Sequence, residues 1–170
     1  MISRYFHTIR YLKLKQIYYR IWFHLIKPII RENPQINIRV LENEFCSPIK
    51  KRISLLNENT FKFLNESQSL SEVGWNGTSN TITKLWRYNQ HYFDDLNAVE
   101  SSKRKVWHDK LLENWVYKNS IGKGVGWESY PTSIRIVNWV KWHLLGNKLS
   151  DTSVQSLAFQ AHWLNKRIEW

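Results

Sequence analysis

The sequence predicts a mainly α-helical protein with one small β-hairpin. Apolar residues recur at helical spacing in several segments, and Gly and Pro residues stand between these segments. Only the stretch near residues 60–70 alternates with a period of two. At 170 residues, the chain is long enough for one domain with its own core, or for the opening part of a larger domain.

The first element that we expect is a basic, aromatic helix over residues 4–27. The residues that recur at roughly helical spacing among Arg and Lys are Tyr5, Ile9, Leu12, Ile17 and Ile21, and Pro28 ends the pattern. Such a helix either docks on the rest of the protein or lies on a membrane surface. We favour docking, because the aromatic residues of 18–24 are spread around the helix and weaken its amphipathic character.

Residues 29–60 predict a linking arm, and the period-two alternation of 60–64 predicts the first strand of a hairpin. Asn65, Glu66 and Ser67 can turn the chain back into a second strand over 68–70. We therefore divide the chain into an N-terminal helix with its arm, 1–80, and a helical region, 81–170.

Three helices follow in the second region. A helix over 103–118 is expected to bury Val106, Trp107, Leu111, Leu112 and Trp115, and the glycine-rich stretch 122–126 ends it as a loop. The next helix begins near Pro131 and extends to about Leu145.

Ser150 or Asp151 can cap a third helix of this region. Its predicted buried stripe consists of Val154, Leu157, Ala158, Ala161, Leu164 and Ile168. Because this helix is still periodic at Trp170, we expect the chain to be truncated.

Charge and aromatic content restrict the class of partner. Lys and Arg number 25 against 14 Asp and Glu, which gives a formal net charge of +11. This charge favours nucleic acid, an anionic membrane surface or an acidic polymer such as a uronic-acid glycan. The ten Trp residues either fill a core between helices or stack on sugar rings or bases.

Several classes of site are disfavoured. Cys46 is the sole cysteine, which excludes an internal disulfide, and the six His residues show no metal-ligand spacing, so we expect no metal and no cofactor. No apolar run approaches the ~20 residues of a transmembrane helix, and basic residues interrupt what would be a signal peptide. Localisation stays open, with the cytoplasm indicated by the sequence alone, and so does the oligomeric state.

The segment 126–142 predicts a helix with two unlike faces. Ile136, Val137, Val140 and Leu144 fall within an arc of roughly 100°, and the opposite arc carries Arg135, Asn138, Trp139 and Trp142. Guanidinium, amide and indole groups bind planar anions and stack on rings, which suits an acidic sugar. The alternative is an interior helix packed on both sides, with Arg135 and Asn138 bonded to neighbouring backbone. The pattern alone does not decide between these two interpretations.

Two blocks of the sequence resemble the heparinase II/III-like polysaccharide lyases. LWRYNQHYFDDL at 85–96 is similar to the segment "LWRYNLHYFD" of that family, and GWESYPTSIRIVNWVKW at 126–142 is similar to "GWEPYPTSLRIVNWIKW", with Ser129 where proline is common. The segments 5–10 and 16–22 resemble the family's N-terminal helix. The likeness covers most of the chain and is weakest between about 30 and 60.

The resemblance implies an α/α toroid of helical hairpins, incomplete here, that is followed by a β-sandwich. The implied reaction is β-elimination at a uronic acid of an acidic glycan, with an Asn, a Tyr and a His in the catalytic roles. These map beyond residue 170, and many members of the family are periplasmic. His143 to Asn147 spell something close to the family's "HLLGNH" motif, but their position at a helix end indicates that Asn147 is a helix-terminal residue.

We therefore expect a piece of a polysaccharide lyase that supplies a wall of the glycan cleft and lacks the catalytic residues. An acidic polysaccharide is the expected partner. A basic aromatic nucleic-acid-binding module and a membrane-surface protein are the alternatives. The expected substrate-binding residues are Trp127, Tyr130, Arg135, Asn138, Trp139, Trp142, Asn89 and His91.

Overall fold

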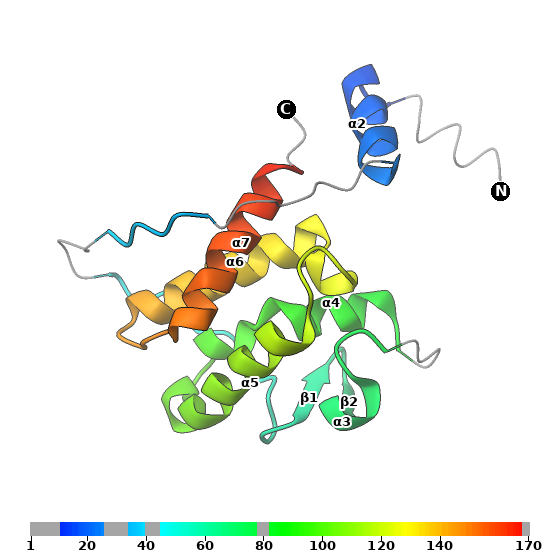
Figure 1. Ribbon diagram of the computed structural model, residues 1–170. Coiled ribbons are helices and arrows are strands. Elements are labelled where there is room, and N and C mark those ends of the chain that lie inside the picture. Colours follow the sequence, from blue (N-terminus) through cyan, green and yellow to red (C-terminus); the bar gives the residue numbers. More distant parts are fainter. Residues whose placement is uncertain (1–10, 26–33, 40–44, 78–81, 168–170) are drawn as a thin grey trace.

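The structure, a computed structural model, describes residues 11–25, 34–39, 45–77 and 82–167. Within these ranges it is mainly helical, with a small two-stranded antiparallel sheet, as the sequence predicts. Helices α4 to α7, within residues 84–165, form the body of the molecule, the sheet lies at one edge, and helix α2 (Leu14–Leu25) stands apart from the body (Figure 1). The helix that was expected over 4–27 is confirmed over Leu14–Leu25; residues 11–13 are not helical, and the remainder of the predicted range lies outside the described residues.

The predicted hairpin forms, but its turn lies at Leu64 and Asn65, so Glu66 and Ser67 belong to the second strand and Leu70 to the helix after it. β1 (Thr60–Phe63) pairs with β2 (Glu66–Ser69), and Phe63 lies opposite Glu66. Leu64 and Asn65 form the two-residue connection with positive φ angles of 53° and 65°, which is the backbone of a type I′ turn. The short helix α3 (Leu70–Val73) follows directly.

The arm before the hairpin is fastened to the helical body by a buried carboxylate. Oδ1 of Asp95 accepts hydrogen bonds from the backbone N–H groups of Ser54 and Leu55 at 2.7 and 3.0 Å. Oδ2 of the same group contacts Arg104 Nε and His108 Nε2, both at 2.8 Å. Burial by itself raises the pKa of Asp95, but these donors outweigh it and leave the pKa below its ordinary value.

Three of the predicted helices form where expected. Helix α5 (Lys105–Lys118) follows a 3₁₀ turn at Ser101–Arg104, and helix α6 (Ser129–Leu144) carries Pro131 in its first turn. Helix α7 (Asp151–Asn165) is capped by Ser150, whose Oγ accepts a hydrogen bond from Ser153 N at 3.3 Å. The shorter helix α4 (Lys84–Tyr92) is capped by Thr83 and ends at Phe93, which adopts the left-handed conformation.

The core is a cluster of aromatic side chains enclosed by α4, α5, α6 and α7. Seven Trp residues belong to it: Trp75, Trp86, Trp115, Trp127, Trp139, Trp142 and Trp163. Leu55, Phe61 and Val73 from the segment before residue 80 belong to the same cluster. The arm with its hairpin and the helical region therefore share one core over the described residues.

Two predicted helix faces differ from the observed ones. In α5, Leu111, Leu112 and Trp115 are buried as expected, but Val106 is exposed and His108 is buried in its place. In α7 the buried residues are Ser153, Ser156, Gln160 and Trp163, whereas the predicted stripe is only partly buried at Val154, Leu157, Ala158 and Leu164 and is exposed at Ala161. Ile168 lies outside the described residues. The α7 face was wrongly predicted because Gln160 accepts a hydrogen bond from Arg135 of α6 and Trp163 packs on Trp127, and spacing along α7 does not reveal these partners.

Candidate functional site

The face of α6 that was expected to line a groove lies inside the protein. Arg135 and Trp139 have no exposed surface, and Asn138 and Trp142 are 3% and 2% exposed. On the opposite side of the helix, Val137 is 49% exposed and Val140 is 36% exposed. The prediction that this face of α6 lines an open saccharide groove is therefore wrong. Of the alternative, the burial and bonding of Arg135 and Asn138 are confirmed, but the helix is not packed on both sides, because Val137 and Val140 are exposed.

The guanidinium of Arg135 can be buried because its neighbours satisfy it. Nε donates to Gln160 Oε1 at 2.9 Å and Nη1 donates to the carbonyl of Gly126 at 2.8 Å. The guanidinium carbon lies 3.9 Å from the centre of the Trp115 ring, in a cation–π contact. Burial lowers the pKa of Arg135. Such a group is a structural tie between α6, α7 and the loop before α6.

The large ring area explains why α6 turns its indoles inward. Trp139 packs edge-on against Phe93 and Trp115, at centroid distances of 5.5 and 5.7 Å. Burying two indoles removes more apolar surface from water than burying two valines, at about 25 cal/mol per Å². The rings therefore determine the orientation of the helix, and the smaller valines remain on the outside.

Two more of the expected site residues, Asn138 and Trp127, also have structural roles. Asn138 Nδ2 donates to the carbonyl of Tyr92 and to Asp94 Oδ1, each at 2.8 Å, and so caps the end of α4. Trp127 is 2% exposed and its Nε1 donates to the carbonyl of Asn119. The expectation that these residues line a glycan cleft is therefore wrong, as it is for His91. Each of them either fills the core or forms hydrogen bonds with buried backbone groups.

His91 lies at the contact between the two motif blocks and has no exposed surface. Its Nε2 lies 3.1 Å from the carbonyl of Trp75, and Trp115 Nε1 donates to its Nδ1 at 2.9 Å, which defines a neutral tautomer. A Cβ atom on Gly126 would lie 2.6 Å from His91 Nδ1, so only glycine fits there. Burial above all, followed by the charge of Arg135, lowers the pKa of His91 to about 3.

Two of the eight expected residues, Tyr130 and Asn89, reach the surface. Tyr130 is 58% exposed at the start of α6, and Asn89 is half-buried on the outer side of α4. Tyr130 packs against Tyr88 and Tyr92, with ring centroids 6.1 and 5.8 Å apart. The Tyr88 hydroxyl donates a short hydrogen bond to Glu128.

Lys84 completes this cluster, which is called the tyrosine cluster below. It consists of the buried Tyr92 and of four side chains that reach the surface: Lys84, Tyr88, Glu128 and Tyr130. Lys84 Nζ lies 2.9 Å from Glu128 Oε2 and 5.3 Å from the centre of the Tyr88 ring. The hydrogen bond to Glu128 raises the pKa of Lys84, and burial, followed by Glu128, raises the pKa of Tyr88. Burial likewise raises the pKa of Tyr92. At neutral pH the cluster therefore holds an ammonium group that is paired with the Glu128 carboxylate, beside protonated phenols.

A basic hollow of about 530 Å³ lies beside Asn89 of α4. Three cations, Lys51, Arg52 and Lys62, line it together with one carboxylate, Asp94, which lies 3.6 Å from Lys51. Phe63, Leu64, Asn65 and Asn89 are among its other lining residues. Asn89, which lines the hollow, and Tyr88 of the tyrosine cluster are neighbours in α4.

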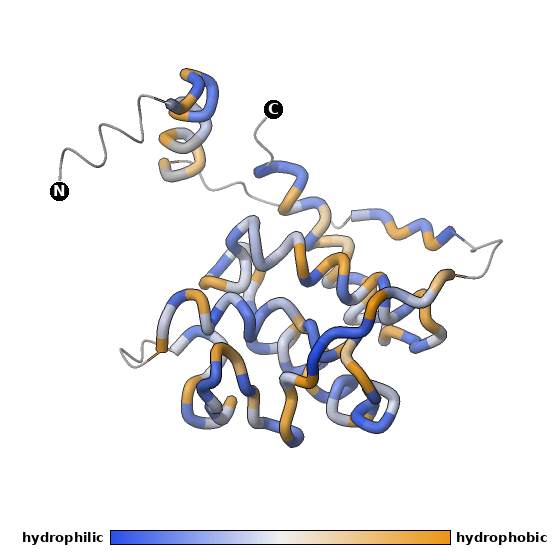
Figure 2. The backbone as a smooth tube through the Cα atoms, turned by 180° about the vertical axis from the view of Figure 1, so that it is seen from behind, coloured by the Kyte–Doolittle hydropathy of each residue, from blue (hydrophilic) through white to orange (hydrophobic). Residues whose placement is uncertain are grey.

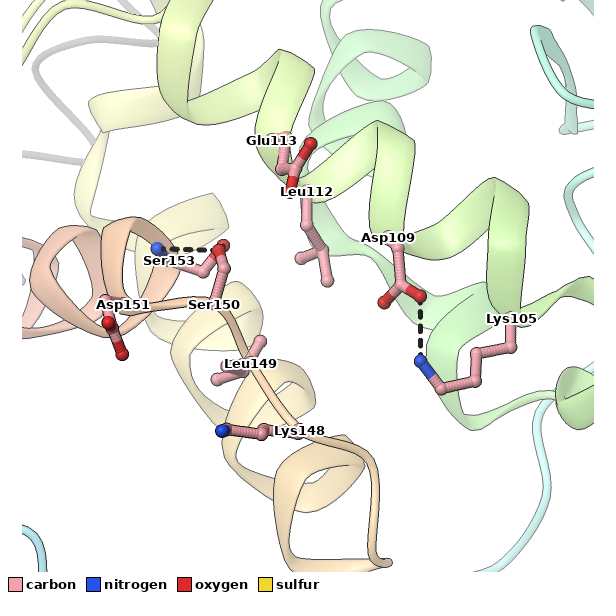
Figure 3. A pocket seen from close by; sticks show the side chains of 9 residues that line it. All are labelled: Lys105, Asp109, Leu112, Glu113, Lys148, Leu149, Ser150, Asp151 and Ser153. Carbon is pink, nitrogen blue, oxygen red and sulfur yellow. Dashed lines mark hydrogen bonds and ion pairs between the residues drawn. The ribbon is translucent and has the colours of Figure 1, made fainter.

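A second hollow, of about 420 Å³, has the opposite charge balance. It lies between α5 and the start of α7, and Figure 3 shows Lys105 paired with Asp109 beside the Ser150 cap. Three carboxylates, Asp109, Glu113 and Asp151, line it against two lysines, Lys105 and Lys148. An anionic ligand fits the basic hollow better on charge alone.

Asn147 is a helix-terminal residue, as predicted. Its Nδ2 donates to the carbonyl of Trp142 at 3.0 Å, and its own carbonyl contacts His143 Nδ1 at 3.0 Å. Gly146 between them has a φ of 89°, the left-handed conformation that ends many helices.

Sequence reasoning missed Lys51, Arg52, Lys62, Lys84, Tyr88 and Glu128. For α4 a usable signal was present, because Leu85, Tyr88, Asn89 and Tyr92 follow helical spacing and Leu85 is 53% exposed. For the hollow no local signal existed, since hairpin, arm and helix bring its residues together from distant parts of the chain.

The chain matches no protein-family model, no curated protein and no solved structure. Within the described ranges, no cluster of three or more His, Cys, Asp or Glu side chains could hold a metal ion. None of the described helices combines the length and the apolar character that crossing a bilayer requires.

Proposed function

We propose that this chain binds an acidic polysaccharide along the outer side of α4, from the basic hollow to the tyrosine cluster. We further propose that it belongs to a heparinase II/III-type lyase, in which α4 to α7 form the first helices of an α/α toroid. In such an enzyme this surface would hold uronate units while residues elsewhere perform the β-elimination. The chain would then bind its substrate without turning it over.

The basic hollow is the observation that carries the proposal. Its three cations outnumber its one carboxylate, and it is open enough to admit a sugar unit. Lysine and arginine side chains attract uronate carboxylates, and the amides of Asn65 and Asn89 can bond sugar hydroxyl groups. A polyuronate carries one carboxylate on every sugar unit. This spacing suits a surface that has the lysines of the basic hollow at one end and Lys84 at the other.

The tyrosine cluster supplies the second kind of contact. Tyr130 is more than half exposed, and its ring can stack on the apolar face of a sugar. Lys84 lies in the same cluster, and a ligand carboxylate would share its ammonium group with Glu128. The two motif blocks that resemble the lyase family meet at this cluster, since Tyr88 comes from the first block and Glu128 and Tyr130 come from the second.

Nucleic acid is the weaker candidate ligand. Binding of single strands without sequence preference relies on aromatic side chains that are free to stack on bases. Seven of the ten Trp residues are enclosed in the core of this protein and cannot do so. No described arrangement favours bases over sugars.

The test compares binding of the chain to alginate, heparin, neutral dextran and a single-stranded oligonucleotide by isothermal titration calorimetry. We expect binding to an acidic polysaccharide and none to dextran. The triple variant Lys51→Ala, Arg52→Ala, Lys62→Ala should weaken this binding about tenfold, because three exposed cations leave the hollow. No unsaturated uronate should appear by ultraviolet absorbance.

The matched control removes the same charge elsewhere. The control is the triple variant Lys103→Ala, Lys105→Ala, Lys118→Ala. These three lysines lie on the exposed side of α5 and of the 3₁₀ turn before it, away from the basic hollow. Equal weakening by both triple variants would show that net charge alone drives binding. That result, or tighter binding to the oligonucleotide than to either polysaccharide, would refute the proposal.

A further inference from the structure

Helix α2 (Leu14–Leu25) carries a continuous apolar stripe that faces away from the protein body. Leu14, Tyr18, Ile21, Trp22 and Leu25 are exposed by 85%, 56%, 56%, 43% and 74%. At 100° per residue these five side chains fall within an arc of roughly 100°. Five large apolar side chains on one exposed helix face form a contact surface.

The other side of α2 is the one turned toward the body. Ile17, Tyr19 and Phe23 are half-buried, and the guanidinium of Arg167 lies 5.8 Å from the Phe23 ring. Figures 1 and 2 both show α2 near the C-terminal end of α7 and apart from the rest of the helical body. The orientation thus leaves the apolar stripe as the outermost surface.

The charge of the N-terminal segment indicates which kind of partner the apolar stripe of α2 contacts. Residues 1–31 contain seven Lys and Arg and no Asp or Glu. Lys15 is exposed and lies about 20° from Trp22 on the helix surface, at the edge of the stripe, and Lys13 is exposed just before the helix begins. An apolar stripe bordered by ammonium groups matches a lipid bilayer with anionic headgroups, where lysine stems reach up to the phosphates.

The aromatic residues of the stripe fit the same partner. Tyr18 and Trp22 stack on each other, with ring centroids 5.9 Å apart. Tyrosine and tryptophan combine an apolar ring with one polar atom, which favours the boundary between headgroups and acyl chains. A stripe made for the core of another protein would not need basic borders.

We propose that α2 is an interfacial helix that attaches this protein to the surface of an anionic membrane. The helix lies in the plane of the bilayer boundary, with Leu14, Ile21 and Leu25 among the acyl chains and the lysines at the phosphates. The polysaccharide-binding surface of α4 then stays in the aqueous phase. This attachment does not depend on the proposed polysaccharide binding, because no residue is shared.

The experiment is vesicle flotation of the full chain at moderate salt. Vesicles of phosphatidylcholine alone are compared with vesicles that contain about one third phosphatidylglycerol. We expect the protein to float with the anionic vesicles and to float with the neutral ones at least tenfold less. The double variant Ile21→Ser, Trp22→Ser should lose at least tenfold of the binding to anionic vesicles.

The control variant is Val106→Ser, Tyr117→Ser, which removes two exposed apolar side chains from α5 and should float as the wild type does. Circular dichroism of both variants checks that the helical content is unchanged. Failure to float with anionic vesicles, or flotation that Ile21→Ser, Trp22→Ser leaves intact, overturns the proposal. So does a dimer in analytical ultracentrifugation that this double variant dissolves, because a second copy would then cover the stripe.

Discussion

Helices α6 and α2 both combine aromatic and basic residues, yet they bury opposite kinds of surface. Helix α6 encloses Arg135, Trp139 and Trp142 and leaves Val137 and Val140 exposed, whereas α2 leaves Trp22 and Ile21 exposed. Helix α6 contacts α4 and α7 along its length, so its indoles and guanidinium find partners. A helix face is therefore defined by what its neighbours offer, and residue type alone does not determine which side is inside.

The test with the largest expected change in stability replaces one Trp residue in each of the two helices. Trp139→Ala should destabilise the protein by about 4 kcal/mol, because it leaves a large cavity between Phe93 and Trp115. Trp22→Ala should change stability by no more than about 0.5 kcal/mol, because the ring is exposed. Urea denaturation measures both, and similar losses in the two variants would contradict the orientation of α6.

The second test measures how the free energy of unfolding depends on pH, because the buried His91 contributes to that dependence. His91 is neutral in the folded protein, and protonating it would set its Nδ1–H against the Trp115 N–H. Its pKa of about 3 lies below the ordinary 6.5, so its contribution to stability is present above pH 6.5 and is lost as the pH falls toward 3. Between pH 7 and pH 5 the loss should be roughly 2 kcal/mol.

The control for this second test is His91→Gln, which cannot titrate in that range. Its stability at pH 7 is expected to be lower than that of the wild type, but the part of the pH slope that belongs to residue 91 should be absent. Denaturation curves at both pH values give the difference in slope. Identical slopes for the variant and the wild type would show that His91 is not held neutral.

The smallest expected effect concerns the outside of α6. Val137→Lys should change the free energy of unfolding by no more than about 0.5 kcal/mol, because residue 137 is half exposed and lysine is a better helix former than valine. The orientation expected from hydrophobic periodicity would instead bury a charge at this site and cost several kcal/mol. Thermal denaturation distinguishes the two outcomes.

The buried polar residues of α6 explain why the side of this helix that faces the core was predicted incorrectly. Arg135 and Asn138 look like surface residues because burial of an unpaired guanidinium or amide is costly. Both become favourable inside through partners from elsewhere in the chain: Gln160 comes from α7 and the Tyr92 carbonyl from α4. Asn89 and Tyr130 reach the surface as expected. Two cations of the hollow, Lys51 and Arg52, come from the arm, which had the weakest pattern, and the third, Lys62, comes from the hairpin.

The sequence by itself determined the helical class, the hairpin, and the positions of α5, α6 and α7. These features depend on spacing along the chain, on the Ser150 cap and on breaks at Gly and Pro, all of which act over a few residues. Only the tertiary structure decided which side of α6 and α7 is enclosed, where the basic hollow lies, and that the stripe of α2 is outermost. Those outcomes depend on partners more than 20 residues away, such as Gln160 for Arg135, and local periodicity carries no information about them.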